Sequence, residues 1–156
     1  MAAVLDAVLA TYPSWSLLVV RVGLGVIFFA HGAQKVLGWF GGHGLAATIK
    51  SFRGMGVPPA AAAMAAFIEF LGGLGMLFGL LARPAAIGII VVMLVAIAKV
   101  HGKHGFFLSN QGFEYNLALI GLCLPILICG PGRFSIGRYL PLPTSTRTGR
   151  PVALLE

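Results

Sequence analysis

Acidic residues are scarce in this sequence. Only 4 of its 156 residues are Asp or Glu, whereas 11 are Lys or Arg, and charged residues together make up 10% of the chain. Soluble domains carry about 25% charged residues, so a chain that is 58% hydrophobic is not an ordinary soluble domain but an integral membrane protein. In a soluble protein the net charge of +7 would suggest nucleic acid as a partner. Here several cations flank apolar segments, so we expect the lipid bilayer as the partner and no nucleic acid.

Cysteine is also rare. Cys123 and Cys129 are the only two cysteines, and no CxxC motif occurs. Six residues of helix separate them by about 9 Å of rise and roughly 120° of rotation, which prevents a disulfide within one helix. We therefore expect no dithiol chemistry by this chain alone.

Motifs for metal binding, haem binding, phosphate binding and nucleophilic catalysis are missing as well. His101 and His104 supply two imidazoles three residues apart, but the spacing places no third ligand beside them. His43 would have to fold over from another segment. We predict no metal site and no covalent cofactor. The N-terminus lacks the positive start of a signal peptide, and we expect it to remain in the mature chain.

What the sequence does contain is long apolar runs. A helix rises about 1.5 Å per residue, so a run of about 20 residues can cross the hydrocarbon core of a bilayer. The runs predict an all-α fold, an integral membrane four-helix transmembrane bundle. We expect residues 1–140 to form a single transmembrane domain and residues 141–156 to be a disordered tail. The predicted spans are residues 15–38, 59–82, 84–100 and 113–129.

A short amphipathic helix is predicted between the first and second spans. Leu45, Ile49 and Phe52 recur at helical spacing, while Lys50 and Arg53 lie on the other side. This pattern is typical of an interfacial helix that lies in the headgroup layer.

The second span carries one charge, Glu69, in its middle. A charge at this depth is costly and normally turns toward a partner or a cavity. Arg21 lies about 10 Å inside the first span, and antiparallel packing would place it close to the depth of Glu69. We predict an intramembrane Arg21–Glu69 pair, which either only joins the two spans or also faces a ligand or a proton path. Gly72, Gly75 and Gly79 in the same span, with Gly75 and Gly79 four residues apart, predict close helix contact.

A second polar group gathers at the far ends of the spans. It is either an interfacial belt of cations and satisfied histidines or a polar mouth that binds a quinone head group or an anion. If a quinone binds, we expect it at this mouth and not beside Glu69, because a carboxylate repels a carbonyl oxygen. The members of the predicted mouth are His31, Gln34, Lys35, Lys99, His101, Glu114 and Asn116.

Cations do not settle the orientation in the membrane. Four spans place both termini on one side, and each side then carries five Lys or Arg residues. We expect both termini in the cytoplasm, because the cations of the other side are placed in the amphipathic loop or the mouth. The two sets are Arg83, Arg133, Arg138, Arg147 and Arg150 on the terminal side, and Lys35, Lys50, Arg53, Lys99 and Lys103 opposite.

Three segments together resemble the DoxX family of small bacterial and archaeal membrane proteins. They are RVGLGVIFFAHGAQKVLGWF at 21–40, GVPP followed by IEFLGGLGMLFGLLARPAA within 56–86, and GPGRFSIGRYL at 130–140. The family often has an acidic residue after the last motif, but Gly137 stands there in this chain, so no role for that carboxylate carries over. The resemblance implies a four-span bundle linked to respiratory or oxidative-stress redox chemistry. Relatives are associated with quinone-coupled oxidation and with membrane complexes of redox enzymes.

The resemblance and the residues together favour one function and leave two others open. The favoured one is a membrane subunit of a redox complex in the bacterial or archaeal cytoplasmic membrane, not catalytic alone, which anchors a partner oxidoreductase and contacts quinone. The second is a carrier for small solutes, anions or protons, which would need a homo-oligomer because one chain encloses little volume. The third is a purely structural assembly factor.

Overall fold

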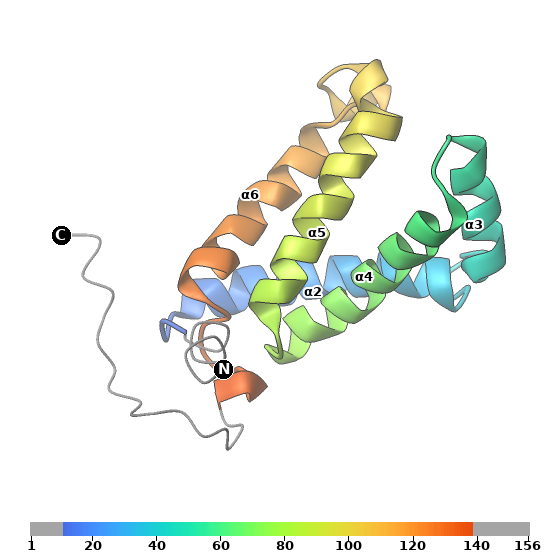
Figure 1. Ribbon diagram of the computed structural model, residues 1–156. Helices are drawn as coiled ribbons and strands as arrows, with labels where there is room; N and C mark the ends of the chain where they lie inside the picture. Colours follow the sequence, from blue (N-terminus) through green and yellow to red (C-terminus); the bar gives the residue numbers. More distant parts are fainter. Residues whose placement is uncertain (1–10, 139–156) are drawn as a thin grey trace.

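Every regular secondary-structure element in the described part of the protein is a helix. The computed structural model describes residues 11–138, so the predicted tail at 141–156 lies outside the described residues. Three helices are long and apolar enough to cross a membrane, at Trp15–Val36, Pro59–Phe78 and Ala82–His104, and Glu114–Cys129 is a shorter apolar helix. The α-helices in Figure 1 are α2 (Trp15–Val36), α3 (Gly44–Gly54), α4 (Pro59–Phe78), α5 (Ala82–Ala96) and α6 (Glu114–Cys129).

Helix α2 packs against α4 in an antiparallel pair, at glycines that allow close backbone contact. A Cβ atom on Gly32 would lie 2.3 Å from the Phe70 backbone, and one on Gly73 would lie 2.2 Å from the Phe29 nitrogen. Both contacts share one register, which puts Glu69 level with Ala33 and puts Arg21 just beyond the end of α4. The two helices are therefore staggered along their length.

A tight turn connects α4 to α5. Gly79 ends α4 with φ +66°, and Leu81 precedes α5 in the same left-handed region with φ +52°. A left-handed residue is the usual end of a helix, and glycine adopts it without strain. Gly79 is thus a helix cap, and it also lies at a contact between helices, because a Cβ atom there would lie 2.5 Å from Arg21 Nη1 of α2. A Cβ atom on Gly75 would lie 2.8 Å from Leu80 O of its own turn and 3.7 Å from Ala85 Cβ of α5, so the predicted contact between spans is confirmed at both glycines.

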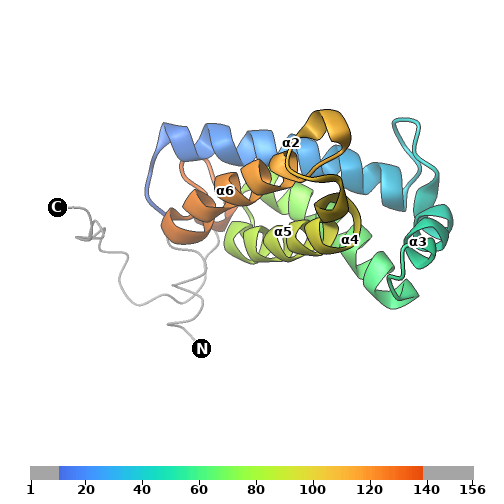
Figure 2. The same ribbon diagram turned by 90° about the horizontal axis from the view of Figure 1, so that it is seen from above.

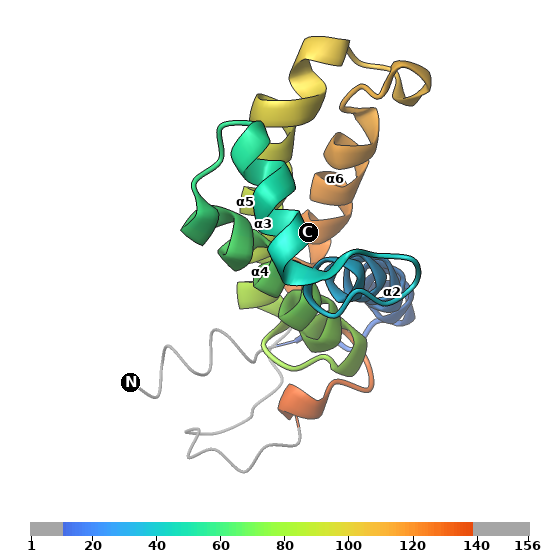
Figure 3. The ribbon, with the colours of Figure 1, turned by 90° about the vertical axis from the view of Figure 1, so that its right-hand side faces the viewer.

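The molecule consists of two helix pairs that diverge. Helix α5 runs beside α6, and this pair stands at a steep angle to the α2–α4 pair (Figures 1 and 3). The pairs meet near the turn between α4 and α5 and separate toward α3, and Figure 2 shows the same layout from above. The core between them contains Leu24, Phe28, Met76, Ile89 and Ile126.

The outer faces of the helices are apolar. Val19, Leu71, Leu94 and Ile128 are among the large hydrophobic side chains that are more than half exposed, with exposures of 70%, 59%, 53% and 72%. Exposed apolar faces on four helices fit contact with lipid tails. Cys123 and Cys129 are free thiols on α6, as their spacing predicted.

Helix α3 has the predicted amphipathic pattern. Leu45, Ile49 and Phe52 are half-buried, whereas Lys50 and Arg53 are exposed. The helix contacts both α2 and α4. Its position in the headgroup layer stays a prediction.

The two ends of the described chain lie together. Tyr12 N donates to Cys129 O at 2.9 Å, and Arg133 N donates to Ser14 O at 3.3 Å. The start of α2 and the end of α6 are therefore on the same side of the molecule. Which side of the membrane this is stays a prediction.

Candidate functional site

The partner of Glu69 is Lys35. Lys35 Nζ donates to Glu69 Oε2 in an ion pair that joins α2 to α4. The Glu69 side chain is only 3% exposed, whereas the Lys35 side chain is 26% exposed. The predicted Arg21–Glu69 pair is wrong, because the estimate of depth assumed that both spans begin and end at the same planes. The stagger of α2 against α4 instead brings Lys35 within two residues, about 3 Å along the helix axis, of the level of Glu69.

Arg21 binds main-chain carbonyls and not a carboxylate. Its Nη1 donates to Met76 O at 2.9 Å and Leu77 O at 3.0 Å, and its Nη2 donates to Arg133 O and Phe134 O, both at 3.3 Å. Met76 and Leu77 belong to the last turn of α4, where carbonyls lack helical partners and the helix dipole favours a cation. Arg21, 1% exposed, thus joins three segments of the chain and is not available to a ligand.

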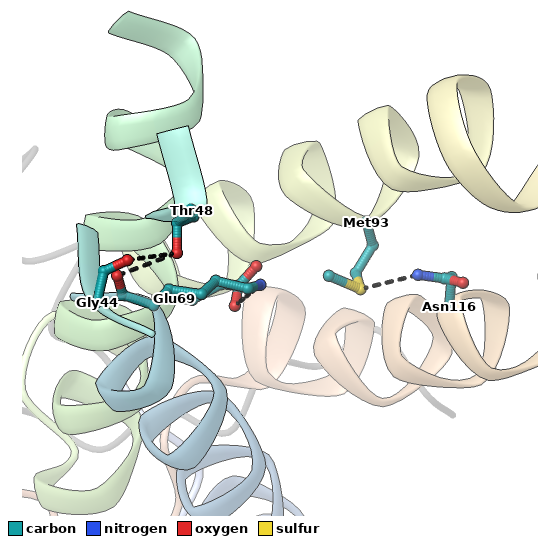
Figure 4. A network of polar contacts seen from close by, with 6 residues as sticks. Gly44, Thr48, Glu69, Met93 and Asn116 are labelled. Atoms are coloured by element: carbon teal, nitrogen blue, oxygen red, sulfur yellow. Dashed lines mark hydrogen bonds and ion pairs between the residues drawn. The ribbon is translucent and has the colours of Figure 1, made fainter. Parts of the chain in front are cut away.

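A cavity of about 460 Å³ lies between the two helix pairs. Its walls come from α2, α3, α4, α5 and α6 and are mostly apolar, with Phe28, Ile68, Val92 and Leu119 among them. Figure 4 shows Glu69 with its ion pair and, on the α5–α6 side, the 3.4 Å contact of Asn116 Nδ2 with Met93 Sδ. The polar side chains that line the cavity are His31, Lys35, Glu69, Lys99, His101, Tyr115 and Asn116.

Five of the seven residues of the predicted mouth line this cavity: His31, Lys35, Lys99, His101 and Asn116. Gln34 does not, because its Nε2 donates to Phe40 O at 3.0 Å and it lines a second cavity. Glu114 does not either, because its Oε1 accepts from Leu108 N and fixes the connection between α5 and α6. The predicted separation of the mouth from Glu69 is wrong, since Glu69 lies in the same cavity.

The backbone is irregular just after α5, where Lys99 and His101 lie. After Ala96 the chain makes a π-helical turn over Ile97–His101, and both Lys99 and His101 line the cavity from this turn. His101 Nδ1 lies 2.8 Å from Gln111 O, which fixes the ring. Single π turns within α-helices are often found at functional sites.

Phe52 is a cavity residue that the site prediction omitted. It reaches the cavity from α3, and Lys35 Nζ lies 6.0 Å from the centre of its ring. This distance is at the limit of a cation–π interaction. Phe52 belongs to the apolar face of the amphipathic helix, and this face is the sequence signal for its burial. The amphipathic pattern predicts that this face contacts lipid, whereas Phe52 faces the cavity.

Potential metal ligands are dispersed in the part of the chain that the structure describes. Within residues 11–138 no group of three or more His, Cys, Asp or Glu side chains is placed to hold a metal ion. The cavity instead presents ammonium and imidazole N–H donors, and one carboxylate acceptor, to an apolar volume. Such an arrangement can hold a molecule with an apolar body and an oxygen-bearing head.

Comparisons with known proteins give one family and two relatives. A family model described as DoxX matches residues 16–102. The chain is 32% identical over 123 residues to "Inner membrane protein YqjF" of Escherichia coli (strain K12), covering 79% of this chain and 90% of the relative. It is 35% identical over 109 residues to "Putative oxidoreductase CatD" of Bacillus subtilis (strain 168), covering 70% of this chain and 76% of the relative. No solved structure matches.

Proposed function

The chain belongs to the DoxX family, as its motifs predicted, and from this premise we propose that it is a quinone-binding membrane subunit. In this proposal it is a multi-pass protein of the bacterial cytoplasmic membrane that anchors a partner oxidoreductase, with both termini in the cytoplasm. The names of the two relatives, an inner membrane protein and a putative oxidoreductase, support the location and the redox context.

The observation that carries the proposal is the mixed lining of the cavity. Its volume of about 460 Å³ lies within the roughly 300–1,000 Å³ of small-molecule pockets, and such pockets combine apolar walls with a few polar groups. A quinone has the matching chemistry, because its ring carbonyls accept hydrogen bonds and its isoprenoid tail is apolar. The space between the diverging helix pairs would take the ring, and the tail would continue into lipid.

Different polar residues of the cavity would contact different parts of the head group. Lys99 and His31 are exposed enough to move and can donate to the two carbonyl oxygens. Lys35 is held in place by Glu69, so its remaining N–H groups point from a fixed position. Phe28, 2% exposed, offers a ring face at the base of the cavity. Electrons would come from the partner oxidoreductase, and the chain itself would not be catalytic alone.

Binding of decylubiquinone, a short-tailed ubiquinone, to the purified protein in mild detergent tests the proposal. We expect His31→Ala and Lys99→Ala each to weaken binding about tenfold, which corresponds to about 1.4 kcal/mol and to one hydrogen bond from a charged or polar donor. The matched controls are His104→Ala and Lys103→Ala. Both residues are exposed, lie in the connection between α5 and α6 and do not line the cavity. No binding to the wild type, or equal binding by all four variants, would contradict the quinone site.

A carrier function has one observation in its favour, the buried Lys35–Glu69 pair. Arg21 no longer contributes to this alternative, because its hydrogen bonds go to main-chain carbonyls. Proton or anion flux in proteoliposomes that is lost in Glu69→Gln would support a carrier. If Glu69→Gln instead lowers the stability of the protein and changes neither quinone binding nor flux, the result would favour the assembly factor.

A further inference from the structure

A second cavity meets the first at Lys35. It has a volume of about 290 Å³ and lies under α3, where α2 ends. Lys35 and Phe52 line both cavities. The remaining walls of this outer cavity are Gln34, Gly41, Gly42, His43, Ala47, Thr48 and Ser51.

The outer cavity is an open hollow at the surface of the protein, and water can enter it. Imidazole, amide and hydroxyl groups form a larger share of its walls than polar groups do in the inner cavity, although most of the wall is apolar in both. A cavity holds water when it is roomy and offers several polar partners, and both conditions are met here. Its walls are also fixed, because Thr48 Oγ1 donates to Lys35 O at 3.2 Å and a Cβ atom on Gly42 would lie 2.3 Å from Gln34 O.

The exposed fractions of the two paired side chains agree with a position of Lys35 at the outer cavity. Glu69 is buried at 3% exposure, whereas Lys35 keeps 26%, so the pair reaches water through its lysine. The titratable groups around the pair are His31 on α2, Lys99 and His101 after α5, Tyr115 on α6, and His43 before α3. Of these, only His43 lies in the outer cavity.

We propose that the outer cavity is an aqueous port through which Lys35, held by Glu69, passes protons between water and a ligand oxygen in the inner cavity. The ligand part of this inference rests on the proposed function, whereas the port itself does not. For a reduced head group with a phenolate oxygen, an N–H bond of the Lys35 ammonium breaks and an O–H bond forms on the ligand. The resulting neutral amine then takes a proton from water in the outer cavity. One proton moves from water to the ligand, and no electron moves in this step.

Labelling of Lys35 from water tests the port without any ligand. The protein in lipid nanodiscs is treated with sulfosuccinimidyl acetate, which does not cross membranes, and acetylated lysines are located by mass spectrometry. We expect acetylation of Lys35 in the wild type and a decrease in Ala47→Phe, whose ring takes up part of the outer cavity. The matched control is Ala46→Phe, which places the same ring on a neighbouring exposed residue outside the cavity. Exposed Lys50 should be acetylated equally in all three proteins.

Two results would overturn the port. One is a wild type in which Lys50 reacts and Lys35 does not, and the other is equal acetylation of Lys35 in Ala47→Phe and the wild type.

The proton step has its own measurement. An alkyl-tailed nitrophenol is bound as the phenolate, and its protonation after a stopped-flow pH jump is followed by absorbance. We expect slower protonation in Ala47→Phe than in Ala46→Phe, with the same affinity for the probe. Equal rates would overturn the proton step, while failure of the probe to bind would count against the proposed function and leave the labelling result to decide the port.

Discussion

The buried arginine of the described residues, Arg21, finds its hydrogen-bond partners in the main chain. The described residues contain two carboxylates, Glu69 and Glu114, and neither contacts an arginine. Arg21 donates to the end of α4, and Arg83 donates to Leu127 O at 2.9 Å and Ile128 O at 3.0 Å at the end of α6. Helix C-termini offer carbonyls without partners and a negative dipole end. The end of α4 therefore compensates the buried Arg21 without a carboxylate.

Replacement of Arg21 should therefore destabilise the protein strongly. Arg21→Met leaves the carbonyls of Met76 and Leu77 buried without donors, and we expect a loss of about 3 kcal/mol, since hydrogen bonds to charged groups contribute about 1.5–3 kcal/mol each. Thermal unfolding in detergent measures the loss. Arg53→Met, on the exposed side of α3, is the control. Equal melting temperatures for the two variants would contradict the capping role.

The Lys35–Glu69 pair should show coupling in a double-mutant cycle. Loss of one partner of a buried pair costs on the order of 3–5 kcal/mol, and membrane contexts often show less. We expect Glu69→Ala to lower the melting temperature more than Glu69→Gln, since alanine leaves both a void and Lys35 without an acceptor. The double variant Lys35→Met with Glu69→Leu should recover part of the loss, because two apolar side chains leave no unpaired charge. Additive losses in the cycle would show that the two side chains do not stabilise each other.

At the scale of helices, two adjacent glycines on α4 have different environments. A Cβ atom on Gly73 would meet the Phe29 nitrogen at 2.2 Å, whereas one on Gly72 would meet Ile89 Cδ1 at 3.5 Å. We expect Gly73→Ala to force α2 and α4 apart at a cost of about 1–3 kcal/mol, as in other overpacked interfaces. Gly72→Ala should be tolerated, because its new methyl group makes an ordinary contact. If melts of the two variants coincide, the register of α2 against α4 is wrong.

The sequence predicted the helices better than their register. Length and hydropathy are sufficient to define the apolar runs. Local signals then fix where α2 and α4 begin, at Trp15 and Pro59. One such signal is the Ser14 cap, whose hydroxyl accepts from Ser16 N at 3.2 Å. Register depends on which glycines meet across the pair, and apolar composition does not distinguish Gly73 from Gly75. The contact of Gly73 with α2 sets the stagger of the two helices. Because of this stagger, the partner of Glu69 is Lys35 and not the predicted Arg21.

At the scale of the whole molecule, the angle between the helix pairs creates the site. His31, Lys99 and His101 were predicted together because they end neighbouring helices, which is a consequence of topology. Glu69 joins them only because the pairs diverge on its side, and no local pattern encodes that angle. Protein interiors are normally packed without large voids, so the apolar walls of this cavity need lipid or ligand to cover them.

Filling the cavity should remove ligand binding without touching a polar residue. Ala96 lines the cavity from the end of α5, and Ala98, two residues later, is exposed and does not line it. Ala96→Phe places a ring where the quinone ring would lie, so we expect decylubiquinone binding to be lost while the melting temperature in detergent is kept. Ala98→Phe adds the same ring to the outer face and should bind like the wild type. If both variants bind equally well, the quinone does not lie between the helix pairs, and the cavity would then be a space that lipid fills.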